Sequence, residues 1–230
     1  LFFFFYTSSL HYPIMKHSLY CRPFTLFRRL YATKPHHQPN YFQLFPRTFP
    51  NHGPPNDRFL INPKLLRKEY LQLQGETHPD LLLGLLGSNA SNAEGAITAE
   101  EIVAENSKVL NRAYAMLKSP LTRSQHYLML NDIDIMNDDD NNNSSSTSSS
   151  SQFRKIAAQD QELLLMILDI HEQLENCGSQ EELKQLKVEN DQRIVEAEKI
   201  LDDLYYNHHD LQDAAVETIK LNYWCNIKNA

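Results

Sequence analysis

Apolar residues recur at helical spacing along most of the chain, while alternating runs of β-branched residues are few and glycine is scarce. This pattern predicts a mostly helical protein. Asn62-Pro63 supplies an N-cap and a proline at the first helical position, so a helix is expected over residues 63–77. Other helices of this half are expected at residues 41–45, 99–118 and 120–130. The two longest would lie antiparallel and form a hairpin.

A second helical block follows in the last third of the chain. Its first helix would contain LLLMILDIHEQLE, residues 163–175, and stop at Gly178. Ser179-Gln180-Glu181-Glu182 is a capping box that opens a second helix, expected to reach about Tyr206. A third helix is expected over residues 210–227. Three helices with short connections predict an antiparallel bundle, and the fold class is therefore all-α.

The segment between the two blocks has a different composition. Residues 137–150 read NDDDNNNSSSTSSS and offer no side chain that a core would bury. Such a segment is expected to be a flexible linker, and it marks a domain boundary. We expect the linker to extend over residues 132–151.

Charge is distributed unevenly along the chain. Residues 1–56 contain six Lys or Arg and no acid, whereas the other residues carry 16 basic and 29 acidic side chains. The stretch MKHSLYCRPFTLFRRLYATK has the composition of a mitochondrial presequence, with Met15 as a candidate start and cleavage near Tyr31. The other interpretation is a basic tail without a targeting role. Residues 1–38 are in either case set apart from the fold.

Several functional classes lack support in the sequence. A basic excess confined to the N-terminal segment is not typical of a nucleic-acid binder, and no apolar run reaches the ~18 residues that membrane insertion requires. Cys21, Cys177 and Cys225 form no C-x-x-C pair, and His208-His209 is better explained as an exposed pair at a helix start. No phosphate loop or nucleophile elbow is present. We therefore expect no metal, no cofactor and no active site.

The tripeptide His78-Pro79-Asp80 follows the helix predicted over residues 63–77. Proline disfavours helix at the residue before it and stiffens the bend, so the imidazole and the carboxylate would project from a fixed turn. The preceding helix carries the basic residues Lys64, Arg67 and Lys68. A rigid bend beside a basic helix suits docking onto another protein. On the tripeptide alone, a simple helix-ending turn is the other interpretation.

A longer motif follows, because residues 111–123 read NRAYAMLKSPLTR. With the aromatic segment YFQLFPRTFP (41–50), the basic helix and His-Pro-Asp, it resembles the J-domain pattern, whose third helix carries Ala-Tyr, a Leu three residues on, then Pro and Arg. The YFQLFPRTFP opening and the stretch LDIHEQLE (168–175) narrow the resemblance to the HscB/Jac type, the J-protein co-chaperones of iron–sulfur cluster assembly. The resemblance covers about residues 39–230.

This resemblance implies an N-terminal J-domain over residues 39–131, a helical hairpin with short flanking helices, and a C-terminal three-helix client-binding bundle over residues 152–230. His78, Pro79 and Asp80 would then contact a DnaK-type chaperone of the mitochondrial matrix and stimulate its ATP hydrolysis, aided by Lys64, Arg67 and Lys68. The bundle would bind an IscU-type iron–sulfur scaffold. The resemblance assigns this client contact to Leu163, Leu164, Met166, Leu168, Asp169, Glu172, Gln173 and Tyr223.

The residues themselves agree in part with a client surface. The run from Leu163 to Leu168 is apolar on all sides of a helix, more than one buried face requires, so part of it is expected to meet a partner. Residues 152–230 carry 8 basic and 16 acidic side chains, which suits a basic partner or simple solvation. Bundle core is the other interpretation for the leucines and for Tyr223. At the level of function, a J-protein with a different client and a structural adaptor with an idle His-Pro-Asp stay open.

Overall fold

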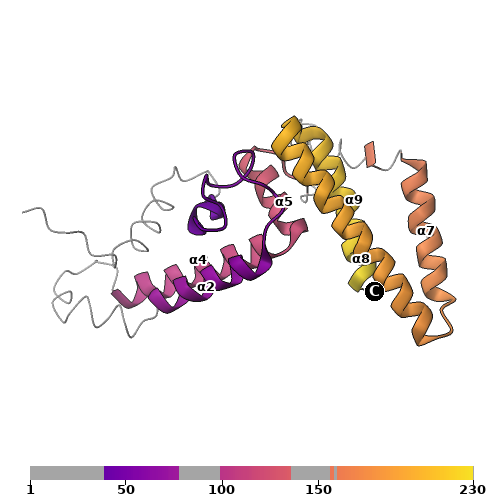
Figure 1. The fold of residues 1–230 in the computed structure, drawn as a ribbon, viewed down its shortest axis with the longest axis horizontal. Helices are drawn as coiled ribbons and strands as arrows, with labels where there is room; N and C mark the ends of the chain where they lie inside the picture. The colour runs from indigo at the N-terminus through magenta and orange to yellow at the C-terminus, as the bar shows by residue number, and fades with distance from the viewer. Residues whose placement is uncertain (1–38, 78–98, 136–155, 158–159, 230) are drawn as a thin grey trace, which may run out of the picture.

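A computed structural model describes residues 39–77, 99–135, 156–157 and 160–229. These residues form helices and no strand, so the predicted all-α class is confirmed for them. The molecule has two lobes that meet at α5 (Figure 1). The predicted presequence, the His-Pro-Asp motif and residues 136–151 of the linker predicted over residues 132–151 lie outside the described residues. The predicted start of the linker at residue 132 was wrong, because Ile133 packs against the core and Ile135 is buried in it.

The first lobe is built on a helical hairpin. Its elements are η2 (Tyr41–Leu44), α2 (Pro63–Glu76), α4 (Ala99–Lys118) and α5 (Pro120–Leu130). The Asn62 side chain accepts from the backbone N–H groups of Lys64 and Leu65, as the predicted N-cap requires. α2 and α4 lie side by side (Figure 1), and the rings of Tyr70 and Tyr114 stack across them with centroids 4.1 Å apart.

An aromatic cluster fills the space between the hairpin and the loop that follows η2. Its fully buried members are Phe42, Phe45 and Phe49. The loop turns at Gly53, which has a φ of +96°, and a Cβ there would come within 2.5 Å of the Phe42 ring. Glycine is therefore required at this turn, since any side chain would displace the ring.

The second lobe consists of α7 (Gln161–Glu175), α8 (Gln180–Asp203), the π-helical turn η3 (Leu204–His208) and α9 (Leu211–Asn229). The capping box is confirmed: Ser179 Oγ accepts from Glu182 N at 3.2 Å, and the Glu182 carboxylate accepts from Gly178 N at 3.2 Å. α7 ends at Glu175, the last residue of the predicted stretch 163–175, and its C-cap is Asn176. The predicted role of Gly178 as the residue after the C-cap was wrong, since Gly178 belongs to the entry of the next helix.

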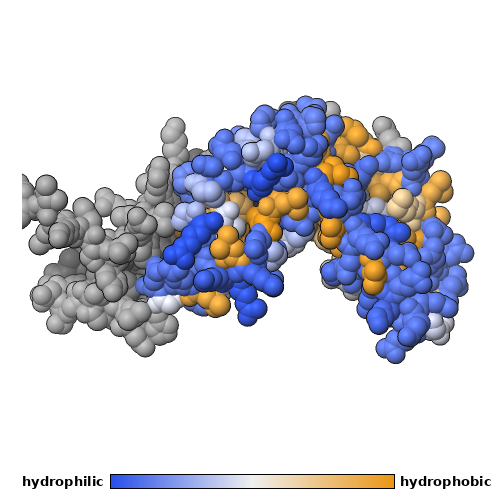
Figure 2. All heavy atoms as spheres, viewed as in Figure 1, coloured by the Kyte–Doolittle hydropathy of each residue, from blue (hydrophilic) through white to orange (hydrophobic). Residues whose placement is uncertain are grey.

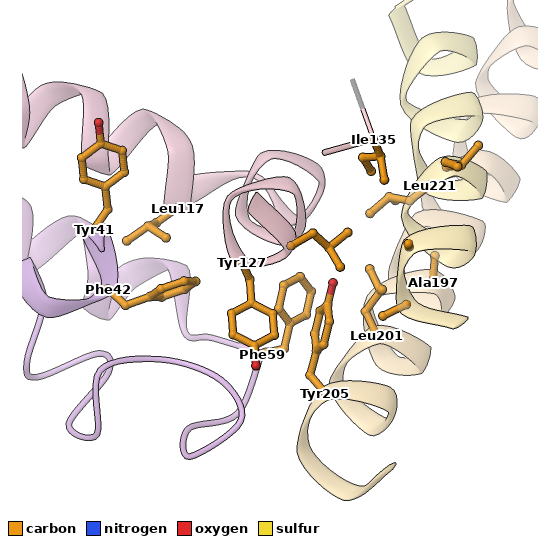
Figure 3. Close-up of a cluster of buried hydrophobic side chains, with 14 of the residues drawn as sticks. Tyr41, Phe42, Phe59, Leu117, Tyr127, Ile135, Ala197, Leu201, Tyr205 and Leu221 are labelled. Carbon is orange, nitrogen blue, oxygen red and sulfur yellow. The ribbon is translucent and has the colours of Figure 1, made fainter. Parts of the chain in front are cut away.

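The two lobes share one hydrophobic core. Figure 3 shows Tyr127 of α5 between side chains of the first lobe and Leu201, Tyr205 and Leu221 of the second. α5 is packed against both α4 and α9. Direct packing therefore holds the two lobes together.

Buried polar contacts reinforce this interface. Arg123 of α5 is 1% exposed; it forms an ion pair with Glu198 of α8, and its Nη1 donates to the Leu117 carbonyl at 2.9 Å. Its guanidinium also lies 4.5 Å from the centre of the Phe59 ring. These contacts join three segments that are far apart in the sequence.

A chain of hydroxyl groups continues the interface beside the ion pair. Ser124 Oγ lies 2.6 Å from both the Tyr205 hydroxyl and Thr218 Oγ1, and Thr218 Oγ1 donates to the Ala214 carbonyl at 2.6 Å. Burial raises the pKa of Tyr205, so this hydroxyl keeps its proton and can donate. Directional bonds of this kind fix one arrangement of the lobes, whereas apolar contact alone tolerates sliding.

Candidate functional site

The predicted basic face of α2 is solvent-exposed. Lys64, Arg67 and Lys68 all lie on the outside of the helix. The neighbouring Glu69 is 4% exposed and accepts hydrogen bonds from the backbone N–H of Arg47 at 2.7 Å and from the N–H and hydroxyl of Thr48. Glu69 therefore ties α2 to the loop after η2 and leaves its three cationic neighbours available to a partner.

The end of α2 is firmly placed. Thr77, the last described residue before His78-Pro79-Asp80, is 3% exposed, and its hydroxyl donates to the Leu73 carbonyl at 2.9 Å. The tripeptide itself lies outside the described residues, so its role in docking stays a prediction.

The second candidate surface lies on α7. This helix touches the rest of the bundle along one edge, where Leu163 and Ile170 are buried and Ile167 and Leu174 are partly covered. The other apolar residues face solvent: Leu164 is 43% exposed, Leu165 67%, Met166 44% and Leu168 65%. Hydrophobic side chains gather over the first half of α7 in Figure 2. A contiguous exposed apolar patch on a helix is typical of a protein-binding surface.

Leu163 differs from the other predicted client residues. Its side chain is only 5% exposed and belongs to the core cluster. It holds α7 against the bundle and cannot contact a partner in this arrangement. Leu165, which was not among the predicted residues, is instead the most exposed leucine of the helix. The signal for it was present in the unbroken run of six apolar residues.

Polar residues complete the α7 surface. Asp169, Glu172 and Gln173 are exposed, and Gln173 Nε2 donates to the Asp169 carboxylate at 2.8 Å. α7 carries four carboxylates and no Lys or Arg. The helix thus presents leucines beside negative charge, which would favour a partner that is apolar and basic.

The start of α7 is anchored to α9. Asp160 caps the helix by accepting from Leu163 N at 3.1 Å, and it also accepts from Lys220 Nζ at 2.8 Å. The hydrogen bond from Lys220 lowers the pKa of Asp160, so the carboxylate stays charged. Tyr223, half-buried and packed against the core, lies one helical turn beyond Lys220 on the same side of α9. It therefore stands on the side of α9 that faces α7.

One further set of contacts, those that join the lobes, had no recognisable signal in the sequence. Arg123, Glu198 and Tyr205 join the lobes and so set the distance between the two candidate surfaces. Arg123 lies in the third-helix motif, but its partner Glu198 is one of many glutamates on α8.

Metal and membrane sites find no support in the described part of the chain. No three His, Cys, Asp or Glu side chains cluster there as metal ligands would. Exposed His208 instead pairs with Asp203 at 3.1 Å, and His209 Nδ1 lies 2.9 Å from the Tyr205 carbonyl. Among the same residues, no helix has the length and apolarity needed to cross a membrane.

Comparison with known proteins agrees with this geometry. Residues 159–230 match the family described as the HSCB C-terminal oligomerisation domain. The matched residues include α7, α8 and α9 of the second lobe, on which the helical hairpin of the first lobe packs through α5. The mitochondrial J-type co-chaperone JAC1 of Saccharomyces cerevisiae is 33% identical over 191 residues, which cover 83% of this chain and 85% of that protein. The mitochondrial jac1 protein of Schizosaccharomyces pombe is 31% identical over 144 residues, 62% of this chain and 51% of its own.

Solved structures give the same result. The Jac1 co-chaperone from Saccharomyces cerevisiae (5-182 clone) superposes with a TM-score of 0.58 at 30% identity, covering 86% of this chain and 93% of the other. The human co-chaperone HscB superposes with a TM-score of 0.59 at 22% identity, covering 86% and 82%, a likeness of fold. The chain therefore belongs to the HscB/Jac1 family, the J-type co-chaperones of iron–sulfur cluster assembly. The names of both fungal relatives support a mitochondrial location.

Proposed function

We propose that this chain brings an IscU-type iron–sulfur scaffold to a DnaK-type chaperone of the mitochondrial matrix and stimulates the ATP hydrolysis of that chaperone. The observation that carries the proposal is the surface of α7, which exposes Leu164, Leu165 and Leu168 beside carboxylates on a helix that the bundle covers along only one edge. The chain itself would catalyse no reaction.

The chaperone contact is assigned to the first lobe. His78, Pro79 and Asp80 would meet the ATPase domain of the chaperone. The exposed cations of α2, Lys64, Arg67 and Lys68, would attract an acidic surface and raise the rate of association. Glu69 supports this role because it anchors α2 from its buried side, so the cations stand on a fixed helix.

The client contact is assigned to the second lobe. Leucines that lose water on binding would supply most of the affinity, and the carboxylates would select basic groups around them. Leu163 is excluded from this surface because its side chain is already buried. The proposed contact residues are Leu164, Leu165, Met166, Leu168, Asp169, Glu172, Gln173 and Tyr223.

The packed lobes connect the two contacts. A client bound on α7 would be held at a set distance from a chaperone bound at α2, because Arg123 and Tyr205 fix the angle between lobes. Such tethering raises the effective concentration of the client at the chaperone without any further contact.

A pull-down of a purified IscU-type scaffold by the full chain tests the client contact. The Leu164→Ser/Leu168→Ser variant is expected to lose binding while its helicity is unchanged. Val188→Ser is the matched control, because Val188 is 51% exposed on α8, away from the α7 surface. Absence of binding by the wild type would overturn the scaffold as client and favour a J-protein with another client.

The chaperone contact needs a separate measurement. His78→Gln is expected to abolish stimulation of the ATPase of a mitochondrial DnaK-type chaperone and to leave scaffold binding intact. Stimulation that persists in His78→Gln would make the motif idle, as in a structural adaptor.

A further inference from the structure

A partly open cavity of about 330 Å³ lies between α7 and α8, and Ile227 and Lys228 of α9 also line it. Its walls are apolar, and they come from all three helices: Ile170, Leu174, Leu183, Leu186 and Ile227. A volume of this size is at the lower end of the range for ligand-binding pockets, roughly 300–1,000 Å³. Apolar walls that a bundle leaves open to solvent are typical of surfaces that bind a partner, so this cavity favours an occupant.

One buried polar residue is among those that line the cavity. Asn190 is 2% exposed, and its Nδ2 donates to the Trp224 carbonyl at 2.8 Å. Its Oδ1 is buried and makes no hydrogen bond with any residue that the structure describes. A buried acceptor without a partner is unfavourable, and most such groups in proteins are satisfied. A group with an N–H or O–H donor would therefore suit this end of the cavity.

The cavity is continuous with the α7 surface. Leu164, Leu168, His171 and Glu175 follow one another at spacings of four, three and four residues, so they lie along one stripe of the helix. The first two are the exposed leucines, and the last two line the cavity. A partner that covers Leu164 and Leu168 thus reaches the cavity mouth along the same stripe.

Charges at the mouth differ from one side to the other. Glu175 stands on the α7 side with the other carboxylates of that helix. Lys187 stands on the α8 side, and Lys228 of α9 is paired with Asp191 at 2.7 Å. An uncharged side chain would pass between them, and basic neighbours of that side chain would meet the carboxylates of α7.

We propose that this cavity receives one large side chain of the client, a tyrosine or tryptophan flanked by basic residues, as the anchor of the complex. The inference rests on the proposed function and adds a pocket to its surface. An aromatic ring would fill the apolar walls, and its donor at the tip would serve Asn190 Oδ1. Buried anchors of this kind dominate the binding energy of many interfaces.

Filling the cavity from within tests the proposal. Leu186→Phe in the full chain is expected to weaken binding of a purified IscU-type scaffold by about tenfold or more, because the new ring occupies the space of the anchor. Leu183→Phe fills the same space from one turn earlier on α8 and should act alike. Val188→Phe, two residues from Leu186 and on the exposed side of α8, is the matched control and should change affinity little.

Unfolding measurements separate this effect from damage to the fold. A ring that enters an existing cavity should leave the unfolding midpoint unchanged or raise it. Wild-type affinity in both filled variants, with binding still lost in Leu164→Ser/Leu168→Ser, would overturn the pocket and leave the proposed function standing. No binding by the wild type would overturn both.

A spectroscopic readout reports on the surroundings of Asn190. Trp224 is the only tryptophan of the chain, and its carbonyl accepts from Asn190, which lines the cavity. The chain labelled with 5-fluorotryptophan should show a shifted ¹⁹F resonance when unlabelled scaffold is added. When scaffold is added to the labelled Leu186→Phe variant, at a concentration that saturates the variant, the resonance should not shift. An equal shift in both proteins would contradict entry of a client side chain.

Discussion

α5 and α7 are two short helices with opposite surroundings. α5 is covered by both lobes, and even its polar residues Arg123, Ser124 and His126 are at most 1% exposed. α7 is longer and more apolar, yet it buries only Leu163 and Ile170 fully. Apolar content alone therefore does not tell which helix forms the core. The chain uses α5 to hold its lobes together, and in the proposed function it leaves α7 for a partner.

The polar contacts of the two helices differ in the same way. Arg123 reaches Glu198 on α8, Ser124 reaches Tyr205, and His126 Nε2 accepts from the backbone N–H of Tyr41 at 3.1 Å. On α7, Gln173 bonds to Asp169 within the helix. Changes in α5 should consequently cost folding stability, and changes on the outer side of α7 should cost binding.

The largest expected effect on stability comes from Arg123→Ala. The change removes the partner of Glu198 and the donor to the Leu117 carbonyl, and it leaves a cavity beside Phe59. Loss of one member of a buried ion pair typically costs about 3–5 kcal/mol; since Glu198 keeps some exposure, about 3 kcal/mol is expected. Urea unfolding of the full chain measures it.

Arg58→Ala is the control for that change. Arg58 pairs with Asp202 at 2.9 Å, but its side chain is 56% exposed, and Asp202 keeps the backbone N–H groups of Phe59 and Leu60. A loss below about 1 kcal/mol is expected. Equal losses in the two variants would mean that the buried pair holds the lobes no better than a surface pair.

The second effect depends on pH. Burial lowers the pKa of His126 to about 4, and the ring nitrogen that accepts from Tyr41 must be unprotonated in the folded protein. Above about pH 6.5 His126 is unprotonated in both the folded and the unfolded protein, so its full contribution to stability is present. Between about pH 6.5 and 4 the unfolded chain binds it and the folded chain does not, so stability falls with pH by about 3 kcal/mol in all.

Unfolding free energies near pH 7 and near pH 5 check this expectation. His126 should account for about 2 kcal/mol of the loss between them. His126→Gln, whose amide oxygen can accept from Tyr41, should remove that part of the pH dependence. A variant with the same pH dependence as the wild type would show that other groups cause it.

These contrasts mark how far a prediction from sequence can reach. Caps and apolar spacing predicted the helices, because Asn62 and Ser179 act on neighbours three or fewer residues away. The run from Leu163 to Leu168 also predicted an exposed surface. Helical spacing shows which residues lie on the same side of α7, but it does not show which side a neighbouring helix covers. Leu163 was therefore placed with the client residues although it is buried.

The interface between the lobes could not be predicted for a related reason. Arg123 and Glu198 are 75 residues apart, and nothing local distinguishes Glu198 from the other glutamates of α8. The same holds for Ser124 and Tyr205, which are 81 residues apart. The cavity beside Asn190 also depends on how three helices meet, which no single periodic pattern encodes.

The smallest expected effect on stability separates two leucines of one helix. Leu163→Ala should cost about 2 kcal/mol, at the low end for a buried leucine because α7 packs along one edge and can settle into the space. Leu165→Ala should cost less than about 0.5 kcal/mol, since Leu165 is 67% exposed. Scaffold binding should follow the opposite order. Leu165→Ala should bind the scaffold more weakly than the wild type while its free energy of unfolding stays close to that of the wild type. If Leu165→Ala loses as much stability as Leu163→Ala does, another part of the protein must cover the outer side of α7. The leucines on that side would then belong to a core and not to a client surface.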